Sequence, residues 1–399
     1  MKLMALALLG NFAAGLAVPA VAHDQAAELF TFDQASGYAP YSGVVADAHG
    51  TIFGTNTYGG NGPCDGGAGC GTIYSLSPPS KGGQSWKLNV LYDFQDDGDG
   101  WFPEAPVTLG PHGSLFGYPA GGSDGTVFQL LPPDKGAKSW TYQILYTFTN
   151  GADGNLLGVI APLVHRGSAL YGVASGGSDV CGQAGCGSVF RLTPPRSGSG
   201  SWTETTLFDF TGTGTGGEPD WIVGPDSGRA LYVATDYDNG SVVEIAPVKG
   251  GTWNETVLTN FAGGNDGSGP SNLVLAADGT IYGTAYLPQG GLVFQLAFAN
   301  GTWTRTNIAN VDYHRYGPAS LAPGADGTLI GVTTGDVDFF PGNVFQLKQS
   351  RGTWSVRQLW DFNKGPDRNP VGVVTGWDGH LYGALNGGDS DTGSVFELK

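Results

Sequence analysis

The stretch GTIYSL at residues 71–76 decides the fold, because close copies of it recur along the chain. Each copy begins with glycine and continues with a short apolar run of the kind that forms a buried strand. Copies separated by about 54 residues indicate an internal repeat, and a period of this length is typical of propellers. The other copies are GTVFQL (125–130), GSVFRL (187–192), GSVVEI (240–245), GLVFQL (291–296), GNVFQL (342–347) and GSVFEL (393–398).

Three further elements surround each copy and complete a unit of four strands. A segment of type VVADAHG (44–50) leads into TIFG (51–54), and the hexapeptide is followed by SWKLNVLYDF (85–94). In this last segment Trp86, Leu88 and Val90 fall on one side of an extended chain, a two-residue period that predicts a strand. The sequence therefore predicts an all-β fold whose units are four-stranded antiparallel propeller blades.

The two ends of the chain predict how the blades close into a ring. The sequence stops at SVFELK (394–399) without a Trp-led fourth strand, whereas ELFTF (28–32) matches VLYDF (90–94). We expect this N-terminal strand to join the C-terminal blade, because closure removes two exposed sheet edges. The alternative is an open solenoid, which would need capping units. We predict a single seven-bladed β-propeller over residues 23–399, with blades at 42–94, 105–148, 157–210, 220–261, 272–311, 319–362 and 370–398 plus 27–32.

The pattern of residues 1–22 predicts that the protein is exported. They combine an early cation (Lys2), an apolar run and the small residues Ala20-Val21-Ala22, as in a cleaved signal peptide. Pro19 interrupts the run, and no later stretch is apolar enough to span a bilayer. We therefore expect a secreted protein, periplasmic or extracellular, without a membrane span.

The four cysteines form two close pairs in glycine-rich loops. Cys64 and Cys70 lie in PCDGGAGCG, and Cys181 and Cys186 lie in VCGQAGCG. Each pair is either a disulfide staple or half of a thiolate metal site, and an oxidising compartment favours the disulfide. Because the loops are short, such bonds would mainly fix loop shape.

The chain is strongly acidic. It has 18 Lys and Arg against 35 Asp and Glu, a net charge of −17. This charge repels nucleic acid and anionic lipid, so we expect neither as a partner. The shortage of basic residues also argues against a polyanionic substrate.

The composite pattern of the units resembles a known repeat. The best-matching copies are LFGYPAGGSDGTVFQLLPP (115–133) and LYGVASGGSDVCGQAGCGSVFRLTPP (170–195). They resemble the tandem repeat of the family called choice-of-anchor tandem repeat GloVer-containing proteins. The resemblance implies a secreted or surface-anchored bacterial repeat protein of unassigned activity, and it carries over no catalytic residues. Because no anchoring segment follows the repeats here, we expect release into the periplasm or medium.

Loops that join strands two and three, and loops between blades, should emerge on one face and surround the central channel, where propeller ligands usually bind. Several between-blade loops place aspartate beside glycine. Asp96, Asp97 and Asp99 could hold Ca²⁺, although the simpler explanation, that Asp-Gly makes the turn, is favoured because no twelve-residue calcium loop is present. We expect no other cofactor.

One between-blade loop, YHRY, carries a histidine and replaces the glycine-rich sequence of the other units. Its residues Tyr313, His314, Arg315 and Tyr316 are candidates for proton abstraction and carboxylate binding, as in polysaccharide lyases on propeller scaffolds. A solvated surface histidine is the alternative. A second catalytic hypothesis is an acid/base pair of carboxylates, with candidates Asp97, Glu104, Glu218 and Asp220.

Aromatic residues are frequent in the loops of the same face. Flat apolar rings beside Asp, Asn and Gln suit sugar rings, although some of these aromatics must fill gaps between blades. Two hypotheses follow: a non-catalytic, monomeric protein that binds an extracellular glycan or other small ligand, or a glycan-cleaving enzyme, a lyase or a glycoside hydrolase. The candidate ligand-binding residues are Trp101, Phe102, Trp221, Tyr237, Tyr286 and Phe339.

Overall fold

The computed structural model describes residues 26–399 except for short segments. These segments are 81–84, 123–124, 136, 177–184, 197–199, 213–215, 226–229, 312–317, 335–341, 363–366 and 389–391. The predicted signal peptide lies outside the described residues, and so do Cys181, Phe339 and the predicted catalytic cluster Tyr313, His314, Arg315 and Tyr316.

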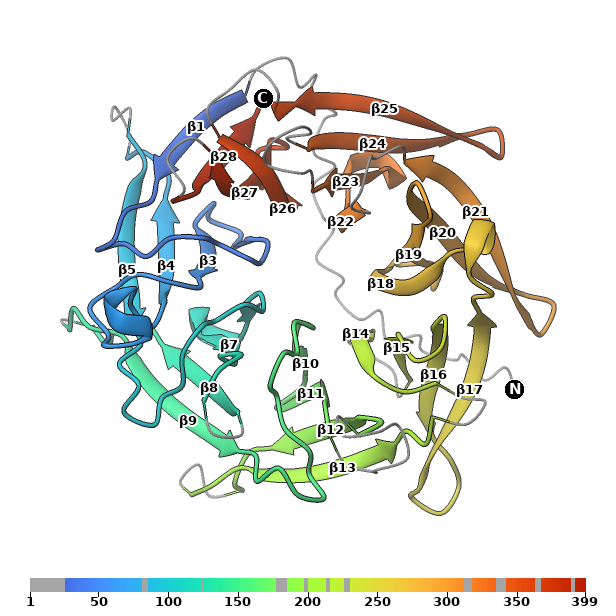
Figure 1. Ribbon diagram of the computed structural model, residues 1–399, viewed down its shortest axis with the longest axis horizontal. Helices are drawn as coiled ribbons and strands as arrows, with labels where there is room; N and C mark the ends of the chain where they lie inside the picture. Colours follow the sequence, from blue (N-terminus) through green and yellow to red (C-terminus); the bar gives the residue numbers. More distant parts are fainter. Residues whose placement is uncertain are drawn as a thin grey trace, which may run out of the picture.

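Seven four-stranded antiparallel sheets stand around a central channel, so the predicted seven-bladed β-propeller is confirmed (Figure 1). Within each blade the first strand lies next to the channel and the fourth lies outside. Blades 1 to 3 consist of β2 (Val45–Ala46), β3 (Ile52–Asn56), β4 (Thr72–Ser77) and β5 (Lys87–Asp93); β6 (Thr108–Leu109), β7 (Leu115–Gly117), β8 (Thr126–Leu131) and β9 (Thr141–Thr147); and β10 (Val164–Arg166), β11 (Ala169–Ala174), β12 (Ser188–Thr193) and β13 (Thr203–Asp209).

The remaining blades follow the same order around the ring. Blades 4 to 6 consist of β14 (Pro219–Val223), β15 (Leu231–Thr235), β16 (Ser241–Pro247) and β17 (Trp253–Asn260); β18 (Ser268–Leu275), β19 (Ile281–Leu287), β20 (Gly290–Ala299) and β21 (Thr302–Val311); and β22 (Pro318–Pro323), β23 (Leu329–Thr333), β24 (Asn343–Ser350) and β25 (Thr353–Asp361). Blade 7 consists of β26 (Asp367–Thr375), β27 (Leu381–Gly388), β28 (Ser394–Leu398) and β1 (Ala26–Thr31).

The conserved spacing of the repeat has a steric cause inside each blade. The glycine of the second strand pairs across the sheet with the aromatic residue of the third strand, as Gly331 does with Phe345. A Cβ atom at Gly331 would lie 2.2 Å from the Phe345 ring, so only glycine leaves room for it. In blade 4 both residues of the pair are replaced by valine: Val233 stands in the place of the glycine and pairs with Val243, which stands in the place of the aromatic residue. The other pairs of this kind are Gly54–Tyr74, Gly117–Phe128, Gly172–Phe190, Gly283–Phe294 and Gly383–Phe396.

Aromatic rings also join each blade to the next. The phenylalanine that ends a fourth strand contacts the phenylalanine of the following blade's third strand; Phe148 and Phe190, for example, have ring centroids 5.1 Å apart. The tryptophan that opens a fourth strand contacts an aromatic ring of the preceding blade, as Trp140 contacts Phe53. Edge-to-face contacts of this type stabilise the interface beyond the area that they bury.

The N-terminal strand closes the ring as predicted. β1 pairs antiparallel with β28. Just beyond β1, Phe32 contacts Tyr74 of blade 1 with centroids 4.9 Å apart, and Trp86 of blade 1 contacts Tyr382 of blade 7. The seam therefore carries the same two kinds of aromatic contact as the interface between blades 1 and 2.

Loops that join second to third strands and loops that join successive blades emerge on one side, here called the upper face. It carries the 3₁₀ turns η1 (Asp65–Gly67) and η4 (Gly264–Asp266), whereas the turns between first and second strands, including η2 (Pro111–Gly113) and η5 (Ala325–Gly327), lie on the lower face (Figure 1). The described residues contain no α-helix, and therefore no helix that could cross a membrane.

Candidate functional site

The upper mouth of the central channel is a cavity of about 520 Å³. The first strands of all seven blades, or the residues directly before them, contribute to its wall. Cavities of this size suit a small ligand rather than a protein surface. The lining includes Ser42, Gly43, Val44, Glu104, Pro106, Ile160, Asp220, Trp221, Asp236, Ser271, Asn272, Tyr286, Ser320, Leu321, Thr334, Val371 and Val373.

Blades 4 and 5 bring two carboxylates and a tyrosine together on one wall. Asp220 lies on β14, Asp236 directly follows β15, and Tyr286 lies on β19. Gly269, with φ of 54°, makes this approach possible, because a Cβ there would lie 2.9 Å from Asp236 Oδ1 and 3.1 Å from the Tyr286 ring. The glycine at position 269 of β18 therefore leaves the space that Asp236 and Tyr286 occupy.

These carboxylates hold their protons more tightly than usual. Burial raises the pKa of Asp220, and the nearby Asp236 raises it further, while a hydrogen bond with Ser271 opposes the rise. Burial also raises the pKa of Asp236. For the half-buried Asp220 the main physical cause is poor solvation of the ionised form, and the negative charge of Asp236, which is itself more exposed, adds to it. A ligand that donates hydrogen bonds, or that carries positive charge, would relieve it.

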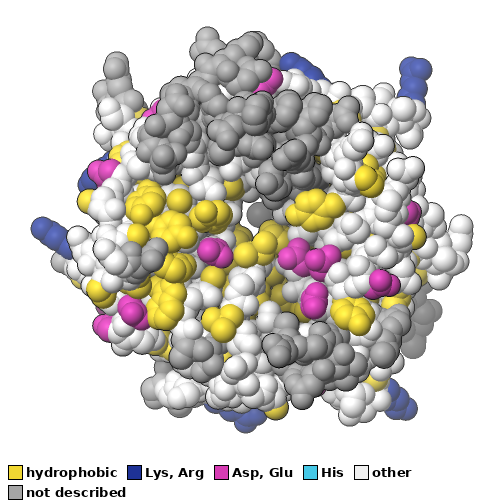
Figure 2. All heavy atoms as spheres, viewed as in Figure 1, with side chains coloured by type: hydrophobic (Ala, Val, Ile, Leu, Met, Phe, Trp, Pro, Cys, Tyr) yellow, Lys and Arg dark blue, Asp and Glu magenta, His cyan; other side chains and the backbone are white. Residues whose placement is uncertain are grey.

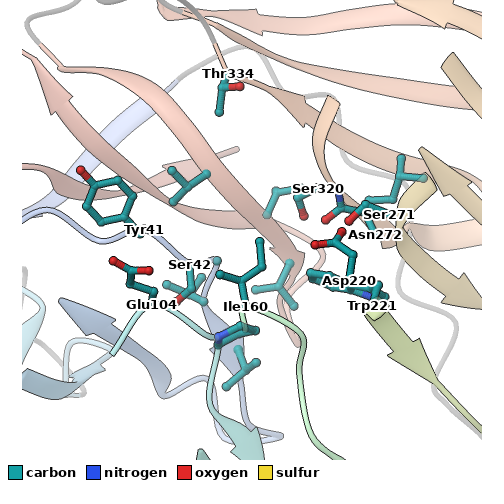
Figure 3. A pocket seen from close by; sticks show the side chains of 18 of the residues that line it. Tyr41, Ser42, Glu104, Ile160, Asp220, Trp221, Ser271, Asn272, Ser320 and Thr334 are labelled. Carbon is teal, nitrogen blue, oxygen red and sulfur yellow. The ribbon is translucent and has the colours of Figure 1, made fainter. Parts of the chain in front are cut away.

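Glu104 stands on another part of the wall, before β6 of blade 2. Burial raises the pKa of its carboxyl group as well. Figure 3 shows Glu104 on the side of the cavity that carries Tyr41, and Asp220 on the side that carries Trp221. Among the described residues, no Lys, Arg or His lines the cavity, so its described wall has only negative formal charges.

Aromatic rings border the same cavity. Trp221 is half-buried and donates a hydrogen bond from Nε1 to the Leu273 carbonyl at 3.2 Å, which fixes the indole beside blade 5. Tyr286 is 55% exposed and Tyr41 is 50% exposed, although both rings line the mouth. Large exposed rings at a cavity rim are typical of ligand-binding surfaces.

From the mouth an aromatic strip, formed by Tyr41, Tyr58, Phe102 and Trp101, leads outward over blades 1 and 2. Tyr58 contacts Tyr41 and Phe102 with centroids 6.5 and 5.0 Å apart, and Phe102 contacts Trp101 at 6.4 Å. Figure 2 shows hydrophobic side chains gathered over this part of the upper face, and acidic side chains on both sides of the central opening.

A disulfide supports the strip from below. Cys64 and Cys70 are bonded and buried, and the Phe102 N–H donates to the Cys70 carbonyl at 2.9 Å. The bond therefore fixes the loop on which Phe102 rests, as the short spacing predicted. Cys186 is disulfide-bonded as well, while its predicted partner Cys181 lies outside the described residues.

The structure separates the other candidate residues from the cavity. Tyr237 lines a different hollow of about 260 Å³, formed by blade 4 and by the loop that joins blades 3 and 4, together with Asn239 and Phe261. Trp101 lines a further hollow with Asp96. Asp97 and Glu218 are exposed in between-blade loops.

Asp99 has a structural role that recurs along the chain. Its buried carboxylate accepts hydrogen bonds from the Tyr92 hydroxyl at 2.8 Å and from the Gln95 N–H at 2.9 Å. Asp153 accepts the same two kinds of bond from Tyr146 and Thr149. The Asp-Gly pattern therefore closes the between-blade turn. A calcium ion at Asp96, Asp97 and Asp99 remains a prediction.

Two lining residues, Tyr41 and Asp236, were not among the candidates from sequence. Asp236 lies in the ATDYDNG segment of blade 4, next to the candidate Tyr237, where blades 1 to 3 have a glycine-rich loop. Tyr41 lies between the closing strand and blade 1, outside the repeat, and only the closed ring brings it to the channel mouth.

The fold and the site together define a class: a seven-bladed β-propeller with an acidic and aromatic cavity at the upper mouth of its channel. Residues 230–399 match the Gloeobacter/Verrucomicrobia repeat, which supports the resemblance to the GloVer repeat recognised in the sequence. No curated protein sequence matches the chain.

Solved structures with the same architecture are distant in sequence. One is the extracellular domain of a candidate hybrid two-component system from B. thetaiotaomicron, 13% identical over 94% of this chain and 39% of that one, with a TM-score of 0.57. Two candidate 6-phosphogluconolactonases have TM-scores of 0.52. That of Bacteroides uniformis is 15% identical over 80% of this chain and 83% of its own. That of Bacteroides fragilis is 14% identical over 86% of each. At these identities the likeness shows the fold alone.

Proposed function

We propose that this propeller binds a neutral or amino-substituted glycan at the upper mouth of its channel. The observation that carries the proposal is the composition of one cavity: Glu104, Asp220 and Asp236 share its wall with Trp221 and Tyr286, and the described lining has no cation. Sugars present C–H faces and hydroxyl donors, which complement aromatic faces and carboxylate acceptors.

The raised pKa values of Asp220 and Asp236 support a ligand rich in donors. Asp220 is half-buried and lies near Asp236, so a hydroxyl or ammonium group that bonds to Asp220 replaces missing water and screens the two negative charges from each other. An anionic sugar would add to the repulsion. We therefore favour neutral or basic sugars over uronic or sulfated ones.

The aromatic strip extends the proposed site beyond one sugar ring. It continues from Tyr41 at the mouth through Tyr58 and Phe102 to Trp101. An oligosaccharide could place one unit in the cavity and further units along the strip. We also propose that the protein acts outside the cytoplasm, which is supported by the Cys64–Cys70 disulfide and by the repeat family.

A second candidate function is hydrolysis of the bound glycan. Burial raises the pKa of both Glu104 and Asp220, and a raised pKa suits a general acid that must hold its proton near neutral pH. With Glu104 and Asp220 on different sides of one cavity, one carboxyl could protonate the leaving oxygen while the other acts as base or nucleophile.

The test is glycan binding by matched aromatic variants. We expect Trp221→Ala and Tyr286→Ala to weaken retardation in affinity gels, or affinity for soluble oligosaccharides, by about 5-fold or more, since each stacked ring contributes on the order of 1 kcal/mol or more. Tyr237→Ala is the control, because this ring is also exposed on the upper face but lines another hollow.

The same assay separates binding from catalysis. Retardation without new reducing ends supports binding alone, whereas products that disappear in Glu104→Gln and Asp220→Asn support hydrolysis. Equal affinity in Trp221→Ala, Tyr286→Ala and the intact protein would contradict a glycan site in this cavity.

A further inference from the structure

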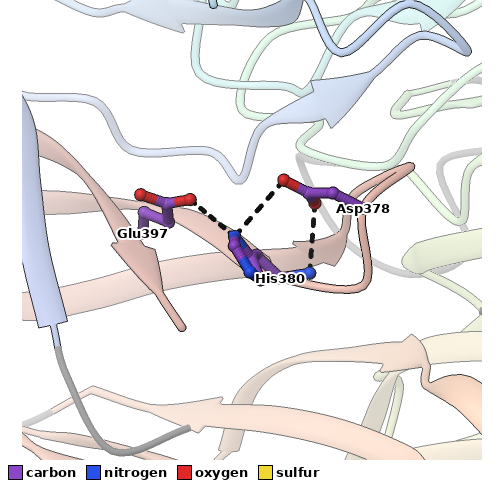
Figure 4. A group of neighbouring side chains, drawn as sticks. All are labelled: Asp378, His380 and Glu397. Carbon is purple, nitrogen blue, oxygen red and sulfur yellow. Dashed lines mark hydrogen bonds and ion pairs between the residues drawn. The ribbon is translucent and has the colours of Figure 1, made fainter. Parts of the chain in front are cut away.

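On the lower face of blade 7, three side chains that can bind metal converge far from the channel mouth. His380 Nδ1 lies 2.7 Å from Glu397 Oε1 and 3.3 Å from Asp378 Oδ2 (Figure 4). One ligand atom from each of the three residues lies within 4.8 Å of the others, and within the described residues no other group of His, Cys, Asp and Glu is this close. Asp378 and His380 belong to the turn between β26 and β27, and Glu397 lies on β28.

Blade 7 alone has this combination, as comparison with the other repeats shows. At the position of His380, blades 1, 5 and 6 have Thr51, Thr280 and Thr328. At the position of Glu397, which pairs with Tyr382 across the sheet, blades 2, 5 and 6 have glutamine: Gln129, Gln295 and Gln346. The repeat can thus form the same turn and strands without the histidine and without the glutamate.

The turn itself needs only one oxygen of Asp378. Its Oδ1 accepts a hydrogen bond from the His380 N–H at 3.1 Å, just as Asp278 Oδ1 does from the Thr280 N–H in blade 5. The other oxygen, Oδ2, is directed to the imidazole. His380 is therefore an addition to a turn that the repeat forms elsewhere with threonine.

Two carboxylates converge here at low solvent exposure. The Glu397 side chain is only 6% exposed, and the Tyr382 hydroxyl donates to Asp378 Oδ2 at 2.8 Å and lies 3.1 Å from Glu397 Oε1. Lys399 pairs with the other Glu397 oxygen at 3.1 Å, so Oε1 faces the histidine and tyrosine. Lys399 supplies one positive charge to Glu397, and a divalent cation between Glu397 and Asp378 would neutralise the second carboxylate as well.

We propose that Asp378, His380 and Glu397 form a binding site for a divalent transition-metal ion, with zinc as the best fit. In a tetrahedral zinc site, bonds of about 2.0–2.2 Å place ligand atoms about 3.3 Å apart, so small side-chain shifts would admit the ion. One imidazole nitrogen with two carboxylates suits zinc better than calcium, which takes oxygen ligands only. The His380 and Asp378 side chains are about a quarter exposed, at 24% and 26%, which leaves the ion a path from solvent.

Metal binding would strengthen the seam of the ring. Glu397 lies on β28 and pairs with Ala27 of the closing strand β1, while Asp378 and His380 belong to the turn before β27. A bound ion would therefore link the turn between β26 and β27 to β28, the strand on which β1 pairs. It would stabilise the folded protein because the site does not exist in the unfolded chain.

The experiment titrates Zn²⁺ into the full-length protein, without an affinity tag and after treatment with EDTA, by calorimetry. We expect one equivalent to bind with micromolar or tighter affinity and to raise the melting temperature, Co²⁺ to give the absorption bands of a tetrahedral or five-coordinate site, and Ca²⁺ to do neither. His380→Thr and Glu397→Gln should weaken zinc binding at least about 10-fold. Both variants insert residues that the repeat uses at these positions, so folding should persist and is checked by circular dichroism.

His112→Asn is the matched control. It removes an exposed imidazole from the corresponding turn of blade 2, where φ of 57° is tolerated by asparagine, and zinc binding should not change. Absence of saturable zinc binding in the intact protein, or equal affinity in His380→Thr, would overturn the proposal.

Discussion

At the scale of single residues, the channel mouth is a place where ionisation opposes folding. Asp220 is half-buried, its pKa is raised mainly by burial, and Asp236 adds a second negative charge to the same wall. A carboxyl group whose folded pKa lies above its unfolded value stabilises the fold below the unfolded pKa. That contribution disappears as the pH rises through the folded pKa.

We therefore predict that Asp220→Asn is more stable than the intact protein at pH 7. The amide keeps the size and the hydrogen bonding of the side chain but removes the charge, so the melting temperature should rise by about 1–3 °C at pH 7. The difference should shrink as the pH falls toward the ordinary pKa of aspartate, because the raised pKa of Asp220 favours the protonated acid in the folded protein.

Thermal melts between pH 4 and pH 8 test this prediction. Asp238→Asn is the control, since Asp238 is exposed on the same face and its φ of 66° suits asparagine. A variant Asp220→Asn that is less stable at pH 7, with the pH profile of the intact protein, would show that the ionised carboxylate is stabilising.

Residue types and spacing predicted part of the site. Glu104, Asp220, Trp221 and Tyr286 could be selected from sequence because the repeat shows which segments reach the upper face. Their convergence on one cavity could not, because the radius of the ring and the tilt of each blade decide which loops meet. Asp236 shows the limit: it sits beside Asp220 only because Gly269 lets β18 approach closely.

At the scale of elements, the glycine and the aromatic residue of each blade act as one steric unit. Gly331 faces Phe345 across β23 and β24, and the three nearest atoms to a hypothetical Cβ at Gly331 all belong to that ring. Blade 4 gives a natural double replacement, since Val233 and Val243 occupy the same two positions. A glycine with an aromatic residue and a valine with a valine both fill the layer between the blades. A valine facing the aromatic residue would clash with it, and a glycine facing a valine would leave a cavity.

We predict strong coupling between these two positions in blade 6. Gly331→Val alone should destabilise the protein by about 3 kcal/mol, because the ring has no room to move, and Phe345→Val alone should cost about 2–4 kcal/mol through the cavity that it leaves. The double variant should be more stable than the sum of both effects by at least about 1 kcal/mol.

Urea unfolding of the two single variants and the double variant measures this coupling. Gly327→Ala in the η5 turn of the same blade serves as a reference for an ordinary glycine: no atom lies within 4 Å of its hypothetical Cβ, although its φ of 72° adds some strain. Strictly additive free energies of unfolding would contradict the steric account.

Strands were well predicted because each is encoded locally by a two-residue period and bounded by glycine. The sequence could not predict the bulge that recurs between the third and fourth strands, as between Val344 and Phe345. A bulge adds one residue to one strand only, so it changes the pairing without changing either pattern.

At the scale of the whole molecule, stability depends on the seam between the two ends of the chain. Local patterns predicted the closed ring only because ELFTF repeats the ending of the other fourth strands. The structure adds the reason: Phe32 is 2% exposed and contacts Tyr74, just as Phe94, also buried, contacts Phe128 one blade further on.

These equivalent contacts allow closure to be tested without truncating the chain. Phe32→Ala should cost about 3–5 kcal/mol in the free energy of unfolding, as should the matched variant Phe94→Ala, because both remove a buried ring from a blade interface. In an open array, Phe32 would lie at a frayed end and its loss would cost little. Urea unfolding of the two variants decides between these cases. A cost for Phe32→Ala below a third of that for Phe94→Ala would show that the seam opens in solution, and with it the mouth of the channel.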